Sequence, residues 1–514
     1  MKLKILFLSS FNITVEIIND SPYYAPEAYR VILNGSEVLT DGKKNVFSLY
    51  ELQAGCDYFL QVITESEEKA IIFKTPDYKY LLSVRDFKVR GDGKTDDTLA
   101  FQAAIMACPP EGILYVPKGN YLLKSLFLKS NLNIYLAEGS KLIASPNRDD
   151  YAILPGFIRS KEDELIIGSW EGNPLDIYTS LITGLNVENV NIFGKGIIDS
   201  SGNLGPWWTK PKKRFGAFRP RGIFLNNCNN IRIQGITVQN TPSWAIHPYY
   251  SKNLGFYDIK ILNPADAPNT DGLDPESCEH LEIIGVHFSV GDDCIAIKSG
   301  KIYMAKNHFR PTRNLEIRNC LMEKGHGAVV FGSEISGGAE NVRVSKCFFS
   351  NTDRGLRIKT RRGRGNYPIN NISFDNIRMY QVKNAFVLNM FYFCDPDGKT
   401  EYVYKKDPLP FDERTPVLGK FNFRNIISED TLVSAGFFYG LPESKIGEIS
   451  LENIKVTYSD QEEFGKPAMM SFIDDYSKLG FYFNNVSKVK IKNVSIQGQN
   501  GKEFIYENVN EVKE

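Results

Sequence analysis

One short sequence step recurs through the middle of the chain and constrains its fold more than any other feature. The step reads asparagine, apolar, any residue, apolar, with histidine replacing asparagine once. It begins at Asn230, Asn253, His280, Asn314, Asn341 and Asn371, so the starts differ by 23, 27, 34, 27 and 30 residues. A period of roughly 20 to 50 residues is typical of repeat architectures, in which each repeat packs on its neighbours.

A second pattern follows in the same phase. It occupies residues 245–249, 272–276, 294–298, 327–331, 355–359 and 385–389. The second and fourth residues of each segment are apolar or proline, whereas the third and fifth are mixed. Alternation with period two sends the first set inward and the second outward. The two patterns predict an all-β fold, a parallel β-helix with stacked strands. The alternative, an antiparallel sandwich, would show shorter periods and paired turn signals.

The first part of the chain has a different organisation. Short strand-like runs alternate with polar turns such as Asn34-Gly35, which predicts a small β-sandwich over residues 1–76. Residues 52–62 resemble the corner that fibronectin type III-like domains build before a late strand. Residues 77–84 are interpreted as a linker, and residues 85–514 as the β-helix domain.

The β-helix is expected to begin with a helical cap. Asp96 or Asp97 is a candidate N-cap for a helix over residues 98–108, in which Leu99, Ala103 and Met106 share one face. A solenoid needs such a plug because an open end exposes unpaired strand edges and core side chains.

The composition restricts the possible partners. Lys and Arg number 61, as do Asp and Glu, so the formal net charge is zero. A neutral chain has no global field that attracts nucleic acid or an anionic membrane, and any preference for an anionic partner must be local. No stretch approaches the length of a transmembrane helix. The eight cysteines show no Cys-x-x-Cys spacing, which favours reduced core cysteines over disulfides or a metal site.

The first residues determine the expected compartment. The apolar run from Ile5 to Leu8 ends at Ser9, is shorter than the hydrophobic region of a secretion signal, and precedes no typical cleavage site. We interpret it as a first strand and expect a cytoplasmic protein. The alternative is a secreted protein with an atypical signal.

Three carboxylates recur at two neighbouring places in the repeat. Asp271 lies in Asn-Thr-Asp-Gly, and Asp292 and Asp293 follow Gly291 in the next coil. Neighbouring parallel strands lie about 4.8 Å apart, so these acids should meet on one face. Three adjacent carboxylates repel one another, so one of them should retain its proton at neutral pH. A protonated acid beside ionised ones would permit acid/base hydrolysis of a glycosidic bond. Solvated turns and a calcium site are the alternatives.

A histidine and a basic cluster continue the same outward column. His326 lies between two glycines and in phase with Asp293. This position favours a role in controlling the protonation of a carboxyl group or in contacting substrate. The densest basic stretch, residues 354–364, begins two coils after the acid pair. Its Arg357 and Lys359 are two residues apart and should point the same way, as expected if they hold a substrate carboxylate.

Four motifs together carry a family resemblance. Residues 269–272, 291–293, 325–327 and 357–359 resemble, in order and spacing, the signature motifs of the polygalacturonase family, glycoside hydrolase family 28. The resemblance covers roughly residues 84 to 500. It implies a right-handed, pectin-lyase-like parallel β-helix that hydrolyses α-1,4 bonds of polygalacturonate or oligogalacturonides with inversion, without a cofactor or metal.

The resemblance also implies roles for individual residues. Asp292 would be the general acid, Asp271 and Asp293 would activate the attacking water, and His326 would support the acid. The substrate would be bound by Asn269, Arg357, Lys359 and Tyr392. Inverting enzymes need about 6.5 to 9.5 Å between their carboxyl groups, which adjacent coils can supply.

One departure from the family pattern bears on specificity. Gly291 stands where many members have Gln, and together with Lys298 and residues 361–364 it is more similar to the bacterial exo-acting branch. Exo action is therefore favoured over endo action. A rhamnogalacturonan hydrolase, a calcium-dependent pectate lyase and a non-catalytic carbohydrate-binding β-helix remain alternatives. The lyase would be stopped by EDTA, and the binding protein would tolerate Asp292→Asn.

Overall fold

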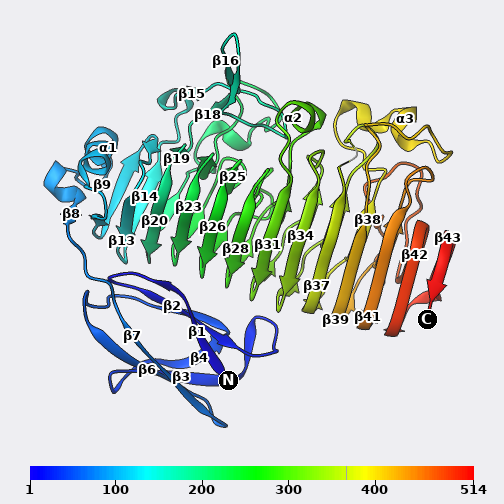
Figure 1. Cartoon of the computed structure of the whole chain (residues 1–514), viewed down its shortest axis with the longest axis horizontal. Coiled ribbons are helices and arrows are strands. Elements are labelled where there is room, and N and C mark those ends of the chain that lie inside the picture. Colours follow the sequence, from blue (N-terminus) through cyan, green and yellow to red (C-terminus); the bar gives the residue numbers. More distant parts are fainter. Residues whose placement is uncertain (366) are drawn as a thin grey trace.

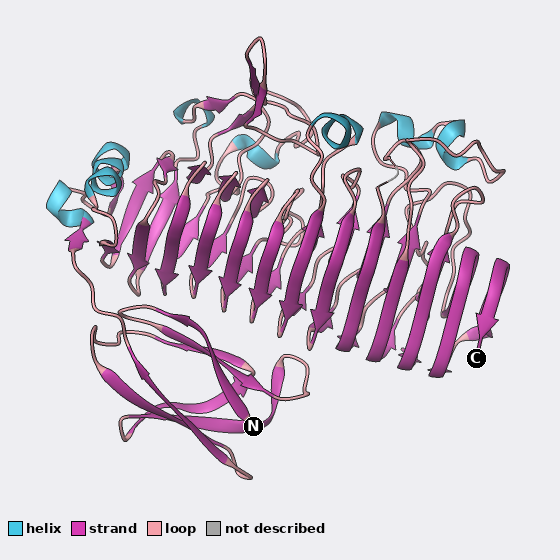
Figure 2. Ribbon diagram, in the orientation of Figure 1, coloured by secondary structure: helices cyan, strands magenta, loops and turns pink. Residues whose placement is uncertain are grey.

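The computed structural model describes residues 1–365 and 367–514. It consists of a long parallel β-helix and a smaller antiparallel unit beneath the first half of that helix (Figure 1). Strands dominate, and the few helices lie at the start and on the upper loops (Figure 2). The predicted all-β fold with a parallel β-helix is confirmed.

The β-helix has three stacked columns of parallel strands. The first column contains β8 (Leu81–Ser83), β10 (Ile113–Val116), β13 (Leu132–Leu136), β20 (Glu188–Gly194), β23 (Asn229–Gln234), β26 (Lys252–Tyr257), β28 (Glu279–Ile284), β31 (Thr312–Arg318), β34 (Ala339–Ser345), β37 (Ile369–Tyr380), β39 (Lys420–Thr431), β41 (Ile446–Tyr458), β42 (Leu479–Gln497) and β43 (Asn500–Lys513). The second contains β9 (Asp92–Asp96), β11 (Gly119–Leu123), β14 (Ser140–Ala144), β21 (Ile197–Asp199), β24 (Thr237–Gln239), β27 (Lys260–Leu262), β29 (His287–Ser289), β32 (Leu321–Glu323) and β35 (Phe348–Ser350). The third column, which carries the candidate site, contains β12 (Leu126–Phe127), β19 (Ile182–Leu185), β22 (Ile223–Asn226), β25 (Ile246–Tyr249), β30 (Asp293–Ile297), β33 (Gly327–Gly332), β36 (Arg354–Lys359), β38 (Asn384–Asn389) and β40 (Ser434–Tyr439).

The recurring asparagine has a structural cause. The six residues that begin the repeated step all adopt a left-handed backbone, with φ between 54° and 60°. Asn tolerates this conformation better than most residues, and a short polar side chain can bond locally. Amides of successive coils also form a ladder, in which Asn371 Nδ2 donates to Asn341 Oδ1 (2.6 Å) and Asn341 Nδ2 donates to Asn314 Oδ1 (3.2 Å). These six residues therefore mark a left-handed position at the second or third residue of six first-column strands.

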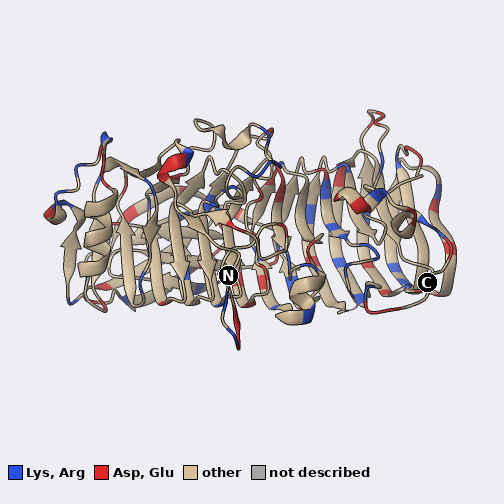
Figure 3. Cartoon of the chain, turned by 90° about the horizontal axis from the view of Figure 1, so that it is seen from above, with Lys and Arg blue, Asp and Glu red and all other residues tan. Residues whose placement is uncertain are grey.

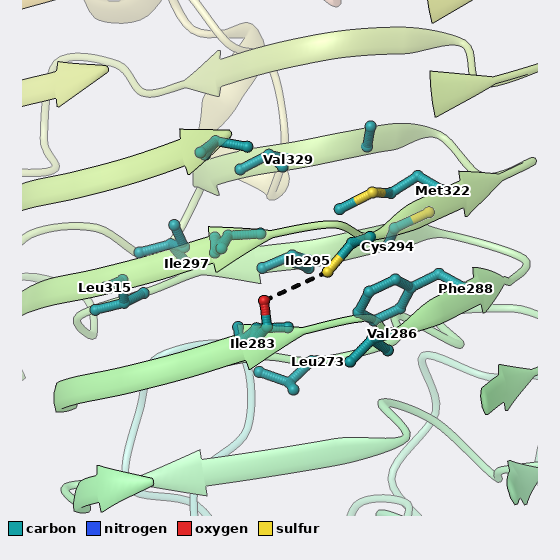
Figure 4. Close-up of a cluster of buried hydrophobic side chains, with 14 of the residues drawn as sticks. Leu273, Ile283, Val286, Phe288, Cys294, Ile295, Ile297, Leu315, Met322 and Val329 are labelled. Carbon is teal, nitrogen blue, oxygen red and sulfur yellow. Dashed lines mark hydrogen bonds between the residues drawn. The ribbon is translucent and has the colours of Figure 1, made fainter. Parts of the chain in front are cut away.

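The interior of the β-helix is a continuous apolar core. Inward side chains from consecutive coils stack on one another, as shown for Leu273, Ile295 and Val329 (Figure 4). All eight cysteines are free and six of them are buried, as predicted. Stacking of like side chains in each coil explains why the apolar period was visible in the sequence.

The predicted capping helix is present, but it packs on the core with a different face from the predicted one. Helix α1 (Thr98–Ala107) buries Phe101, Ala104 and Ile105 at the first end of the core. Leu99 is 86% exposed and Met106 is 59% exposed, so the face predicted to be apolar points to solvent. The prediction of the face is wrong because the larger Phe101 and Ile105 define the stripe that packs.

The upper face carries the remaining short elements. These are η2 (Arg148–Asp150), β15 (Ile153–Leu154), β16 (Phe157–Arg159), β17 (Glu164–Ile166), β18 (Ile177–Tyr178), η3 (Pro206–Trp208), α2 (Ile302–Asn307), η4 (Pro396–Lys399) and α3 (Glu401–Tyr404); η1 (Val84–Phe87) precedes β9. They form a loop layer above the third column (Figure 1). Within the described residues, no helix combines the length and apolarity needed to span a membrane.

The N-terminal unit has two antiparallel sheets. Its strands are β1 (Lys2–Leu8), β2 (Ile13–Ile18), β3 (Tyr24–Leu33), β4 (Ser36–Lys44), β5 (Val46–Leu49), β6 (Asp57–Ile63) and β7 (Glu68–Lys74). The sheets enclose a separate core that includes Val15, Val31 and Phe47. Strand β8, within the expected linker, pairs with β10 of the β-helix. The fibronectin type III-like assignment of residues 1–76 stays a prediction.

A buried charge cluster joins the two units. The Glu16 carboxylate accepts hydrogen bonds from Arg318 Nε (2.8 Å), Arg318 Nη2 (2.9 Å) and Asn319 Nδ2 (2.8 Å). Glu16 is almost fully buried, so its charge is stable there only because these donors replace water.

Removing Glu16 should loosen this junction. We expect Glu16→Ala to lower the free energy of unfolding by about 3 kcal/mol, because Arg318 loses its charge partner in a largely buried position. Differential scanning calorimetry measures the effect. Glu37→Ala is the matched control, since its ion pair with Arg30 is exposed and should contribute less than about 1 kcal/mol. Equal effects of the two substitutions would contradict the prediction.

Candidate active site

A cavity of about 370 Å³ lies on the upper face, over β30, β33 and β36. Seen from above, Lys and Arg positions stand next to Asp and Glu positions over these middle coils (Figure 3). The cavity is lined by Trp170, Glu171, Lys212, Trp244, Asn269, Asp271, Asp292, Lys298, His326, Ser333, Glu334, Asp353, Arg354, Arg357, Lys359, Tyr392, Cys394, Asp395 and Met469.

The structure brings the three predicted acids together. One oxygen of each of Asp271, Asp292 and Asp293 lies within 4.8 Å of the other two. The cause is register, since Leu273 pairs with Ile295 and so places Asp271 beside Asp293 in the preceding turn. This approach is closer than the separation of about 6.5 to 9.5 Å expected for carboxyls of an inverting enzyme.

The predicted phase of His326 is one residue wrong. Asp293 pairs with Gly327, and the His326 N–H donates to the Asp292 carbonyl (2.9 Å). His326 therefore shares a column with Asp292, while Gly327 and Arg354 continue the column of Asp293. The error arose because Ala328 and Val329 both fit an apolar pattern, and periodicity alone does not distinguish a slip of one residue.

Asp293 lies beneath the cavity as a buried, paired anion. Its side chain is fully buried, with Lys359 Nζ at 2.5 Å and Arg357 Nη1 at 3.4 Å. Burial opposes its ionisation, but Lys359 and then Arg357 more than offset this and lower the pKa of Asp293 below its usual value. Asp293 is thus held as a carboxylate, and the two cations predicted to bind substrate already contact it.

The electrostatic environment of Asp292 shifts its pKa in the opposite direction from that of Asp293. It is the one partly exposed member of the three acids and lines the cavity. Burial and the neighbouring Asp293 charge raise the pKa of Asp292, although Lys359 and His326 oppose the shift. Because the pKa of Asp292 is raised and that of Asp293 is lowered, Asp292 can donate a proton while Asp293 is ionised.

Asp271 and its neighbours form a second acidic pair. Burial, followed by the charge of Asp274, raises the pKa of Asp271, and Lys298 opposes the shift. The pKa of Asp274 is raised to about 7, mainly by burial. Asp274 is the third residue of segment 272–276, so the alternation predicted that it points outward, but the sequence analysis assigned it no role.

His326 is exposed and anchored from one side. Its Nδ1 is 2.8 Å from Asp353 Oδ2, and this hydrogen bond raises the pKa of His326. Burial opposes ionisation of Asp353, but the bond to His326 and nearby Arg354 lower its pKa to about 2. Asp353 therefore favours the protonated imidazole and fixes the ring at the cavity edge.

The remaining predicted residues also reach the cavity. Asn269 adopts φ 55°, and its Oδ1 accepts a hydrogen bond from Arg219 Nη2 (2.6 Å). The Tyr392 ring lies 5.5 Å from the Arg357 guanidinium and 5.8 Å from Lys359 Nζ. The aromatic ring thus packs over both cations and stabilises their positions.

Several lining residues were missed by the sequence analysis. Trp170 and Glu171 come from the upper loops, where no period guides an assignment, and Trp244 precedes β25. The Trp244 ring lies 4.5 Å from Lys298 Nζ and 4.3 Å from the Arg221 guanidinium, and the Trp170 ring lies 4.7 Å from the same guanidinium. The two tryptophans could have indicated a site, but the cations that they contact are distant in sequence.

The acid cluster does not fit a calcium ion well. Calcium takes six to eight oxygen ligands, whereas Asp293 already has two cationic partners close to its oxygens. A divalent ion at this position would meet the repulsion of Lys359 and Arg357.

The fold and the site define a parallel β-helix hydrolase with a carboxylate-lined cavity. The sequence pattern "Glycosyl hydrolases family 28" matches residues 114–404, and a pattern named "Rhamnogalacturonase A/epimerase, pectate lyase-like" matches residues 81–141. The chain belongs to glycosyl hydrolases family 28.

Individual relatives agree with this assignment. A probable polygalacturonase of Vitis vinifera is 34% identical over 385 residues, covering 73% of this chain and 74% of its own length. An exo-poly-alpha-D-galacturonosidase of Dickeya chrysanthemi is 24% identical, covering 80% of this chain and 72% of its own. A family 28 exopolygalacturonase structure from Yersinia enterocolitica has a TM-score of 0.73 at 19% identity, covering 99% of this chain and 98% of its own.

The expected cytoplasmic localisation is wrong. The similar plant polygalacturonases, including those of Vitis vinifera and Malus domestica, are of a kind typically secreted to the cell wall. The expectation rested on the first residues, which form strand β1 in the folded protein and carry no information about the compartment.

Proposed function

We propose that this protein hydrolyses α-1,4-galacturonosidic bonds in polygalacturonate and oligogalacturonides by acid/base catalysis. The observation that carries the proposal is the contrast between Asp292, a cavity acid with a raised pKa, and Asp293, a carboxylate ionised by two cations. Glycoside hydrolysis needs such a division between proton donor and charged partner.

The proposed steps follow from the placement of these groups. Asp292 protonates the glycosidic oxygen as the bond breaks, and protonated His326 beside it stabilises the carboxylate that results. Asp271 accepts a proton from the attacking water. Asp293 fixes Arg357 and Lys359 next to the cavity, where their remaining donors face the substrate carboxylate.

Exo action is favoured by the upper loops that line the cavity. Trp170, Glu171 and Lys212 come from loops of the N-terminal half of the chain, and Cys394, Asp395 and Met469 come from loops of the C-terminal half. We expect a cavity lined by such loops to admit a chain end more readily than the middle of a polymer.

Digestion of trigalacturonate and longer oligomers, followed by chromatography, tests this proposal. Stepwise release of mono- or digalacturonate is the expected result, whereas a spread of sizes would establish endo action. We expect proton NMR to detect the β-anomer first, because water attacks opposite the leaving group; an initial α-product would contradict inversion. Activity lost in EDTA, with a product that absorbs ultraviolet light, would indicate a lyase, and cleavage of rhamnogalacturonan alone would indicate the related hydrolase.

A further inference from the structure

Lys298 is a buried cation on which three carboxylates converge. Its side chain is 3% exposed, and its Nζ lies 3.1 Å from Glu334 Oε2, 3.5 Å from Asp274 Oδ1 and 3.9 Å from Asp271 Oδ2. Lys298 and Asp271 both line the cavity. Lys298 directly follows β30, so the strand that begins at Asp293 ends next to this lysine.

Packing fixes the ammonium group in this position. The Trp244 ring lies 4.5 Å from Lys298 Nζ, and the Arg221 guanidinium lies 4.3 Å from the same ring. The backbone is held by a bridge to Glu276 in the preceding coil. A long lysine side chain normally reaches solvent, but here the indole and the strand direct it inward.

The three carboxylates compete for one charge. Glu334 is the nearest, and its own pKa is lowered because Lys298 and other cations outweigh the effect of burial. Neither oxygen of Asp274 has a hydrogen-bond partner among the described residues, so the ammonium group is its main source of stabilisation. Asp271 receives the remaining attraction at 3.9 Å.

We propose that Lys298 is a positioning residue that favours the ionised form of Asp271 and holds its carboxylate toward the cavity, and that Glu334 limits this effect by drawing the ammonium group away. The inference rests on the proposed role of Asp271 as the base that activates water. The charged and titratable groups that act on Lys298 and Asp271 from the surrounding coils are Arg219, Arg221, His247, Asp274, Glu276, Asp292, Asp293, Glu334 and Lys359.

The inference predicts pH shifts of opposite sign for two substitutions. A catalytic base works only when deprotonated, so its pKa defines the acid limb of kcat/KM. Lys298→Met removes the charge that lowers the pKa of Asp271, and we expect the acid limb to move up by about one pH unit or more. Glu334→Gln leaves the ammonium group to Asp271 and Asp274, and the acid limb should move down.

The experiment measures kcat/KM of trigalacturonate hydrolysis from pH 3 to pH 8 for the wild type, Lys298→Met, Lys298→Arg and Glu334→Gln. We expect Lys298→Met to reduce kcat at least about 10-fold on the acid side with a smaller change in KM, and Lys298→Arg to restore the wild-type limb. Thermal unfolding of each variant accompanies the kinetics.

Three outcomes overturn the inference. These are an unmoved acid limb in Lys298→Met, a limb that moves up in Glu334→Gln, and no restoration by Lys298→Arg in a folded protein. If Lys298→Met does not fold, the other two variants still decide the sign. A wild type that cleaves no oligogalacturonide refutes the proposed function itself, whereas an active wild type with unmoved limbs refutes only the role of Lys298.

Discussion

Asp292→Asn is expected to lower kcat for trigalacturonate at least about 1,000-fold with little change in KM. The amide has nearly the same shape as the carboxyl group but no proton acidic enough to give to the glycosidic oxygen. The proposed substrate contacts of Arg357 and Lys359 should remain, because neither side chain hydrogen bonds to Asp292 among the described interactions. The loss should therefore appear in the chemical step, measured by steady-state kinetics with chromatography of the products.

A matched substitution separates this effect from general damage. Asp266 is exposed on the loop that leads to Asp271, and Asp266→Asn should keep at least half of the wild-type kcat. A second signature is the pH profile. Since burial and Asp293 raise the pKa of Asp292, the wild type should remain active above the ordinary carboxyl range, and this alkaline limb should vanish in Asp292→Asn. Unchanged turnover in Asp292→Asn would contradict the role of Asp292 as proton donor, whereas a wild type that binds the oligomer without turnover, with binding unchanged in Asp292→Asn, would support a non-catalytic binding protein.

Lys359→Met should damage both stability and activity. Its Nζ lies 2.5 Å from Asp293, which is fully buried, so the substitution leaves a buried charge with Arg357 as its remaining cation. We expect a loss of about 3 to 5 kcal/mol in unfolding free energy, and a fall in kcat/KM of at least about 100-fold from the lost charge beside the substrate carboxylate. Calorimetry and kinetics measure the two losses separately.

Two comparisons distinguish these contributions. Adding Asp293→Asn to Lys359→Met removes both partners of the buried pair and should recover at least half of the lost stability, but not the activity. On methyl-esterified oligogalacturonide, which lacks the sugar carboxylate, Lys359→Met should differ less from the wild type than on the free acid. An equal ratio on both substrates would contradict direct binding of the carboxylate by Lys359.

The repeat was predictable because its causes are local. Asn341 and Asn371 mark left-handed turns that few other residues adopt easily, and the apolar alternation after them follows from the strand period. The close approach of Asp271, Asp292 and Asp293 followed from the same register. The catalytic and substrate-binding roles assigned to these residues remain predictions.

Errors appeared where the pattern was degenerate. A run of small apolar residues around Ala328 allowed a one-residue slip, which placed His326 beside the wrong acid. In helix α1, Leu99 fitted an amphipathic stripe, yet the core took Phe101 and Ile105. Period alone does not say which of two apolar faces packs, because that choice depends on the surface the helix meets.

The amino-acid sequence by itself determined the coiled architecture and the family, since both depend on features that repeat or stand close together along the chain. Only the tertiary structure decided how charge is distributed in the cavity. Lys298 meets Glu334 across 36 residues, Trp170 stacks on Arg221 from an upper loop, and Arg357 and Lys359 reach back 64 and 66 residues to Asp293. Electrostatic energies depend on distance in space and on burial, and neither quantity can be read from spacing along a chain.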